Sequence, residues 1–416
     1  MLIMTNGDNT ITNQSPSEIS RIQDHRWPSS LYRDPVQFWS LVILSTAVYG
    51  IVPLGETGRA INLSLFDFIV VLLFAIALRD RAVRLDRFVG LATLGAVALI
   101  LIHSAIFLLS EESIELAGLA RETMKSAAYF VEVLLLSMLV KAGGSRLPNF
   151  RVLGLLFALL TFQALALHFR ELYAPGSWFL PRNQHLATLS GIVVLAAVIY
   201  AVGNMPRRYL ISGLVTLISV AFILLNKTYL SVAVAILALL PYLKSTNRGQ
   251  PDARIVSFLA FVLFVVFAML FGSGDALRDI PLLDRLDTIF ESLGFRFQLW
   301  GVAGNAAVGS FPIGIGLGQF ASYLTAEPTL DSQALRFVHN TPLALVVEMG
   351  LAGIIVGGLV VALIVRATRG LPITVSIAIW VYLGLPMLLH DALGLRMAVL
   401  VLATGLAGAL RWDRRR

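Results

Sequence analysis

The most constraining feature of this chain is a series of long apolar stretches, each about 17–25 residues, recurring between residues 37 and 411. A helix of that length crosses roughly 30 Å of hydrocarbon. Amphipathic helices of a soluble protein would show polar residues at helical spacing, and most of these stretches show none. Only 14% of the 416 residues are charged, against about a quarter in a typical soluble domain. We predict an all-α, polytopic membrane protein with about twelve transmembrane helices.

The apolar stretches divide the chain into four parts. These are a cytoplasmic tail (1–36), nine transmembrane helices (37–272), a large extracytoplasmic loop (273–340), and three further helices with a short cytoplasmic tail (341–416). The first tail lacks the apolar segment of a signal peptide, and we expect it to be disordered or to lie on the membrane surface. The predicted spans are 37–54, 63–79, 88–109, 122–140, 150–168, 186–204, 209–225, 228–243, 255–272, 341–365, 372–389 and 395–411.

The distribution of positive charge predicts the orientation. With both termini in the cytoplasm, the cytoplasmic segments hold about two thirds of the chain's 32 Lys and Arg residues, as the positive-inside rule requires. Most acids, including Glu111, Glu112 and Glu115, lie on the other side. The cytoplasmic segments are short, and the positive-inside rule is most reliable for short segments. We expect the bacterial inner membrane, with any chemistry on the periplasmic face and no nucleic-acid partner.

Residues 273–340 are too polar to span a membrane and too long for a simple turn. Within them, residues 282–307 carry apolar side chains at roughly helical spacing, which predicts an amphipathic helix at the membrane interface. Asp284 and Asp287 lie one helical turn apart, but such spacing is common on surface helices. The chain also has no cysteine, so thiolate ligands and disulfides are excluded. We expect no metal site and no cofactor.

Several polar groups near span ends on the predicted periplasmic face are candidates for binding a polyanion such as a lipid pyrophosphate. A charge near the membrane is costly unless it is solvated, paired or functional. Arg offers two parallel donors to phosphate oxygens, and Lys offers a point charge. Each has a simpler interpretation as an interfacial anchor or a snorkelling side chain. The group comprises Arg182, His185, Lys227, Arg296 and His339.

The pair His339-Asn340 precedes Thr341-Pro342, a typical start of a helix. A neutral imidazole accepts a proton near neutral pH, so His339 is a candidate general base, although an interfacial His is more often structural. His390-Asp391, at the end of the eleventh span, is either a second proton-handling pair or a helix end.

The run from Phe311 to Phe320 has glycine at three alternate positions, 314, 316 and 318, which lets the backbone turn tightly or approach a ligand. No strand and crossover helix surround it, so it is not a dinucleotide-binding fingerprint.

Together these motifs resemble the O-antigen ligase and polymerase family of bacterial surface-polysaccharide enzymes, over residues of about 180 to 355. The family shows an Arg followed by a Trp, a Pro-Gly-x-Gly segment, and a His-Asn pair before a helix with Glu and Gly. The matching residues here are Arg296, Trp300, Pro312, Gly314, Gly316, Gly318, Phe320, His339, Asn340, Glu348, Gly350 and Gly353. A second stretch runs from Arg182 to Ala187, and a third from Leu225 to Thr228. In the third, Lys227 stands where the family usually has Arg, which keeps the cation but loses bidentate geometry.

The resemblance implies a metal-independent glycosyltransferase. Its donor is a glycan on undecaprenyl pyrophosphate, and its acceptor is a hydroxyl of lipid A-core or of a growing polysaccharide. His339 and Arg296 are then the expected catalytic residues, with Lys227, Arg182 and Arg296 around the pyrophosphate. Asn340, Glu348, Trp300 and Gly316 are expected to support the site.

Four alternatives remain open at this point, three within the family and one outside it. A ligase and a polymerase differ only in their acceptor, and a protein O-glycosylating enzyme is a third possibility within the family. The alternative of another class is a membrane transporter or flippase, which would show paired charges deep in its spans and two similar halves. Charge within the predicted spans is limited largely to Asp67 and Glu132, and no halves are evident.

Overall fold

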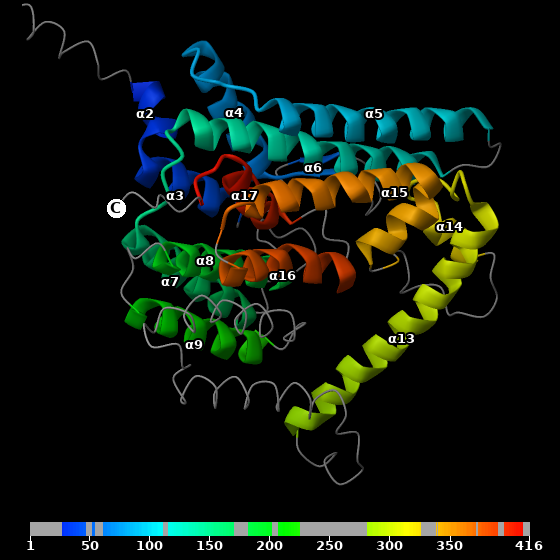
Figure 1. Cartoon of the computed structure of the whole chain (residues 1–416). Helices are drawn as coiled ribbons and strands as arrows, with labels where there is room; N and C mark the ends of the chain where they lie inside the picture. The colour runs from blue at the N-terminus through cyan, green and yellow to red at the C-terminus, as the bar shows by residue number, and fades with distance from the viewer. Residues whose placement is uncertain are drawn as a thin grey trace, which may run out of the picture.

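A computed structural model of the chain describes residues 27–46, 52–54, 61–110, 115–169, 182–201, 207–224, 281–325, 338, 340–371, 373–389 and 395–410. Within these residues there are thirteen helices and one two-stranded antiparallel sheet (Figure 1). The helices are α2 (Trp27–Arg33), α3 (Pro35–Ser45), α4 (Leu65–Arg79), α5 (Arg87–Ser110), α6 (Leu116–Ala142), α7 (Phe150–Phe169), α8 (Arg182–Ala201), α9 (Arg207–Leu224), α13 (Pro281–Ser310), α14 (Phe320–Thr325), α15 (Thr341–Thr368), α16 (Ile373–Leu389) and α17 (Arg396–Leu406). The strands are β1 (Val52–Leu54) and β2 (Ile61–Leu63).

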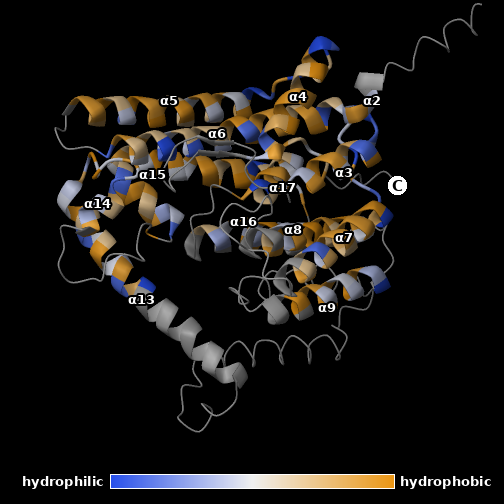
Figure 2. Ribbon diagram, turned by 180° about the vertical axis from the view of Figure 1, so that it is seen from behind, coloured by the Kyte–Doolittle hydropathy of each residue, from blue (hydrophilic) through white to orange (hydrophobic). Residues whose placement is uncertain are grey.

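Three helices among the described residues, α5, α6 and α15, are long and apolar enough to cross a membrane. They lie side by side (Figure 1), and both α6 and α15 pack against α5. The outward face of α5 is apolar, because Leu91, Leu94 and Leu109 are 72%, 64% and 88% exposed. Figure 2 shows the same apolar character along α5 and α15. An exposed apolar face of this length suits contact with lipid rather than with water.

Helix α17 is the central element of the described bundle. It packs against α6, α8, α15 and α16, and every residue from Met397 to Leu406 is buried. A helix that is apolar on all sides needs neighbours on all sides. The sequence predicted a span over 395–411, but the helix ends at Leu406, and a turn follows with Gly408 at a φ of 80°.

Two other sequence predictions need correction near the N-terminus. The span predicted over 37–54 is not one helix, since α3 ends at Ser45 and residues 52–54 form β1, paired with β2. Residues 27–33, predicted as part of a disordered or surface tail, form α2. Tyr32 of this helix is 2% exposed and donates a hydrogen bond to Asp80 at 2.8 Å. A buried aromatic ring with a satisfied hydroxyl explains why this part of the tail is packed.

The other predicted spans that the structure describes are helices whose bounds agree to within a few residues, apart from an earlier start of α6 and α8. Of these, the length and apolar composition for crossing a membrane are shown for α5, α6 and α15. Residues 282–307, predicted as an amphipathic helix, fall within α13. This helix runs diagonally away from the bundle (Figure 1). The predicted spans 228–243 and 255–272 lie outside the described residues.

Basic residues gather at one end of the long helices, which we call the basic end. They include Arg87 at the start of α5, Lys141 in the last turn of α6 and Arg366 in the last turn of α15. The N-terminus of α5 meets the C-terminus of α15 there through an ion pair of 3.5 Å between Asp86 and Arg366. At the C-terminal end of α6, the Arg146 carbonyl accepts a hydrogen bond from the Trp39 indole at 3.1 Å. The segments on either side of this ion pair, both predicted as cytoplasmic, therefore lie side by side, and the orientation itself stays a prediction.

Candidate functional site

The candidate site lies at the opposite end of α5, α6 and α15 and is built around residues 311–319, which we call the glycine loop. Backbone groups of the loop form hydrogen bonds with α15 in place of bonds that the helix lacks at a kink. Gly350 has a φ of 54° and a ψ of −126°, which kinks α15 and interrupts its hydrogen-bond ladder. The Leu351 N–H, which would reach the Val347 carbonyl in an unbroken helix, instead donates to the Pro312 carbonyl at 2.9 Å.

The carbonyls freed by the kink are satisfied by the same loop. The Val347 carbonyl accepts from the Ile315 N–H, and the Glu348 carbonyl accepts from the Gly316 N–H, each at 2.9 Å. Buried backbone groups are almost always paired, so the loop and the kink stabilise each other. The kink and the loop are therefore one structural feature, although more than thirty residues separate them along the chain.

The other side of the loop contacts α5 and α6. The His103 Nε2 lies 2.9 Å from the Ile313 carbonyl. Gly316 has a φ of 94°, and a side chain there would overlap the ring of Phe107. Two hydrogen bonds join the Gln319 side chain to the backbone of Glu115 at the start of α6. The loop is thus held by three helices, a rigidity suited to a site whose groups must keep fixed positions.

Arg296 and Trp300 lie on α13 four residues apart, which places them on the same face of the helix. The Trp300 indole donates to the Val338 carbonyl at 3.0 Å. Arg296 is only 6% exposed. This burial argues against the simpler interpretation of Arg296 as an anchor that faces lipid headgroups, because such an anchor keeps its charge in water.

The C-terminal half of α13, the glycine loop, α14 and the start of α15 share a small apolar core. Asn340 begins α15 as its N-cap, with its side chain accepting from the Leu343 N–H at 3.0 Å. Several residues that the sequence singled out, Arg296, Trp300, Gly316, Asn340 and Glu348, therefore belong to one unit. The buried residues of its core are Leu299, Ala303, Ala306, Phe320, Leu324, Val338 and Val347.

Other predicted residues are not tested by this arrangement. Lys227, His339 and the pair His390-Asp391 lie outside the described residues, and their roles stay predictions. The backbone of Arg182 and His185 is described as the first turn of α8. Val338 and Asn340, on either side of His339 in the sequence, both belong to the unit around the glycine loop.

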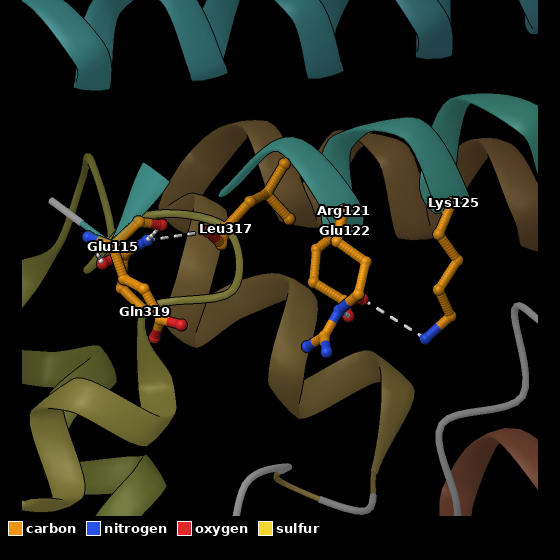
Figure 3. A network of polar contacts seen from close by, with 6 residues as sticks. All are labelled: Glu115, Arg121, Glu122, Lys125, Leu317 and Gln319. Carbon is orange, nitrogen blue, oxygen red and sulfur yellow. Dashed lines mark hydrogen bonds and ion pairs between the residues drawn. The ribbon is translucent and has the colours of Figure 1, made fainter. Parts of the chain in front are cut away.

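Sequence reasoning assigned no role to three charged residues in the first three turns of α6, namely Arg121, Glu122 and Lys125. Glu122 accepts from Arg121 at 3.0 Å and from Lys125 at 3.2 Å, and all three side chains are partly buried. Figure 3 shows them on the same side of α6 as Gln319 of the glycine loop. Two cations share the Glu122 carboxylate beside the loop, and the Glu115 carboxylate lies at the start of the same helix. The available signal was a cation pair at i and i+4 where a span begins.

A second charged cluster lies among α4, α6 and α17. The Asp67 carboxylate accepts from the Ser64 N–H at 2.6 Å and pairs with Arg396 at 3.4 Å. The side chain of Glu132 lies next to Asp67. The sequence had identified the two acids but not their cationic partner, because Arg396 follows them by more than 260 residues.

Within the described part of the chain, no group of three or more His, Asp or Glu residues is placed to hold a metal ion. Comparison of the whole chain with known protein families and with curated proteins finds no match.

Proposed function

We propose that this protein is a membrane-embedded glycosyltransferase that moves a glycan from undecaprenyl pyrophosphate to an acceptor hydroxyl, as an O-antigen ligase or polymerase does. The observation that carries the proposal is the glycine loop itself. Residues that the sequence resemblance groups together, among them Trp300, Gly316, Asn340 and Glu348, belong to one unit joined by hydrogen bonds and an apolar core, at the end of the long helices opposite the basic end. Arg296 lies one helical turn before Trp300 on α13. If the basic end faces the cytoplasm, this unit faces the periplasm, where the lipid-linked donor is presented.

The reaction requires a better nucleophile and a stabilised leaving group. The acceptor oxygen attacks the anomeric carbon, the bond from that carbon to the pyrophosphate oxygen breaks, and lipid pyrophosphate departs. We assign His339 the role of general base, which takes the proton from the acceptor hydroxyl. We assign Arg296 and Lys227, with Arg182 nearby, the role of stabilising the negative charge that grows on the pyrophosphate.

The cation pair on α6 supports the same chemistry. Arg121 and Lys125 stand beside the glycine loop, with Glu122 between them. An arriving pyrophosphate competes with Glu122 for these cations, and charge-assisted bonds to phosphate are among the stronger polar contacts. Arg121 and Lys125 therefore join Arg182, Lys227 and Arg296 as proposed phosphate ligands.

The decisive experiment is transfer of a synthetic undecaprenyl-pyrophosphate-linked glycan by the purified chain in detergent. We expect product without an ion gradient, and its loss in His339→Ala and in Arg296→Ala. Gln298→Ala is the matched control, since Gln298 is an exposed residue of the same helix. Lys227→Arg should retain activity, whereas Lys227→Ala should not. Full activity of Arg296→Ala in a folded protein would remove Arg296 from the mechanism.

Deletion of the gene distinguishes a ligase from a polymerase. Loss of long surface chains with their accumulation on carrier lipid would identify a ligase. Accumulation of single repeats would identify a polymerase.

The cluster of Asp67, Glu132 and Arg396 favours a second candidate, a transporter or flippase. Ionisable residues within transmembrane segments commonly mark ion or substrate pathways. Under this alternative, intact lipid-linked glycan moves across a vesicle membrane in response to an ion gradient, and Arg396→Gln abolishes the movement. If Arg396→Gln still transfers glycan without an ion gradient, the transporter alternative is rejected, and the cluster has a structural role.

A further inference from the structure

A cavity of about 690 Å³ lies among α7, α8 and α9, remote in sequence from the glycine loop. Its volume falls within the range of about 300–1,000 Å³ typical of ligand sites. The lining is overwhelmingly apolar and includes Leu153, Phe157, Leu165, Ile192, Val193 and Leu210. Water would find few partners there, so the expected occupant is itself apolar.

The cavity is an elongated cleft that opens sideways. On α7 its lining runs from Phe150 to Leu165, a rise of about 23 Å. This exceeds half of the roughly 30 Å hydrocarbon thickness of a bilayer, so the cleft has the length of one leaflet. Gly154, Ala158 and Phe162 line the cleft and are exposed, with Phe162 74% exposed. A Cβ at Gly154 or Gly213 would meet no atom within 4 Å, so these two glycines leave the space open.

One end of the cleft is basic and aromatic. Arg151 and Tyr209 line it, and the Tyr209 ring lies 5.1 Å from the ring of Phe150 and 5.2 Å from the Arg208 guanidinium carbon. The N-termini of α7 and α9 both lie here, and their partial positive charges add to those of the two Arg. Basic and aromatic side chains in this arrangement are typical of the level of lipid headgroups.

We propose that this cleft binds an anionic phospholipid, with an acyl chain along α7 and the headgroup phosphate at Arg151 and Arg208. An apolar cleft open to the side admits a lipid chain from the bilayer without passage through water. The two cations select a negatively charged headgroup over a zwitterionic one. The proposal depends on the chain lying in a membrane, and it is independent of glycan transfer.

The test uses the full chain, purified and delipidated in detergent, and titrated with phosphatidylglycerol or with phosphatidylcholine of the same acyl chains. Native mass spectrometry counts bound lipids. We expect one phosphatidylglycerol to bind roughly tenfold or more tightly than phosphatidylcholine. The double variant Arg151→Gln with Arg208→Gln should lose that preference. Arg369→Gln, which removes an exposed Arg that does not line the cleft, should keep it.

Filling the cleft tests the position of the acyl chain. Gly154→Leu and, separately, Gly213→Leu should weaken phosphatidylglycerol binding by roughly tenfold or more. Leu155→Phe adds bulk on the same helix at an exposed residue outside the lining and should have no effect. Thermal unfolding with and without lipid identifies any variant that fails to fold, and the second glycine then serves in its place. Equal binding of the two lipids would overturn the proposal. Unchanged binding in the variants that fill the cleft would also overturn it, and would be expected if another part of the chain covered the cleft.

Discussion

The side-chain amide of Gln319 pairs with the backbone of Glu115 in both directions. The Glu115 N–H donates to Gln319 Oε1 at 3.0 Å, and Gln319 Nε2 donates to the Glu115 carbonyl at 3.1 Å. Gln319 is 6% exposed and Glu115 is half-buried, so both bonds are partly shielded from water. This pair ties the end of the glycine loop to the start of α6, across 204 residues of sequence. It thereby places the cations of α6 beside the loop.

Replacing Gln319 by Ala removes both bonds and leaves the Glu115 N–H without this partner. We expect the free energy of unfolding to fall by about 1–3 kcal/mol, the cost of leaving buried polar groups unpaired. Thermal unfolding of the detergent-solubilised protein measures the change. Ser322→Ala is the matched control, because Ser322 is exposed and its hydroxyl reaches the Glu115 side chain at 3.3 Å. Equal stability of the two variants would show that the amide pair contributes nothing.

Gly316→Ala tests whether the glycine loop needs its left-handed backbone. A residue with a side chain at positive φ costs about 1–2 kcal/mol, and overlap with the Phe107 ring adds to it. We expect a loss of stability above about 1 kcal/mol, measured by thermal unfolding. Gly301→Ala on α13, where a Cβ would meet no atom within 4 Å, should instead be neutral or stabilising.

Combining Gly316→Ala with Phe107→Ala separates the two causes. The second change makes room for the new methyl group but does not alter φ. We expect Gly316→Ala to cost less in the Phe107→Ala background than in the native chain, which a double-mutant cycle reports. Strict additivity would mean that the Phe107 ring is not the obstacle.

The ion pair at the basic end should make stability depend on pH. Partial burial raises the pKa of Asp86, but hydrogen bonds from the Val89 and Phe88 N–H groups and the charge of Arg366 lower it more. Because folding lowers the pKa of Asp86, its charged form stabilises the folded protein. This stabilisation is fully present at a pH above the pKa of the unfolded chain, about 3.9, and is lost as the pH falls through the lower pKa of the folded protein. Asp86→Asn should therefore lower stability at pH 7, by up to about 1 kcal/mol.

The difference between the native chain and Asp86→Asn should narrow as the pH falls below about 4, because Asp86 then becomes neutral too. Unfolding in urea across this range of pH measures it. Asp86→Ala should cost more than Asp86→Asn at every pH, since it also removes the acceptor for the first N–H groups of α5. A difference that did not change with pH would exclude the Asp86 charge as its cause.

The absence of cysteine makes the orientation directly measurable. Arg84 at the basic end and Ser322 beside the glycine loop are both exposed. We expect a membrane-impermeant maleimide to label Ser322→Cys in spheroplasts and to label Arg84→Cys only after permeabilisation. The reverse pattern would place the glycine loop in the cytoplasm and end the proposed function.

Local patterns in the sequence determined the class of fold. Apolar length alone placed α5 and α15 to within a few residues, because crossing hydrocarbon is a property of one helix and needs no partner. The same reasoning failed at residues 52–54, which are apolar but pair with 61–63 as strands. Apolar content by itself does not distinguish a buried strand from a helix segment.

Motif order in the sequence also identified Arg296, Trp300 and the three glycines as related. Only the tertiary structure decided how they relate, because the bonds that join them connect distant residues. The Leu351 N–H donates to the Pro312 carbonyl, the Gln319 side chain donates to the Glu115 carbonyl, and Arg396 forms an ion pair with Asp67. A buried polar group must have a partner, but its own sequence neighbourhood does not say which one. That choice is made when the helices pack, which is why the partner of Asp67 and the position of the α6 cations beside the glycine loop come from the fold alone.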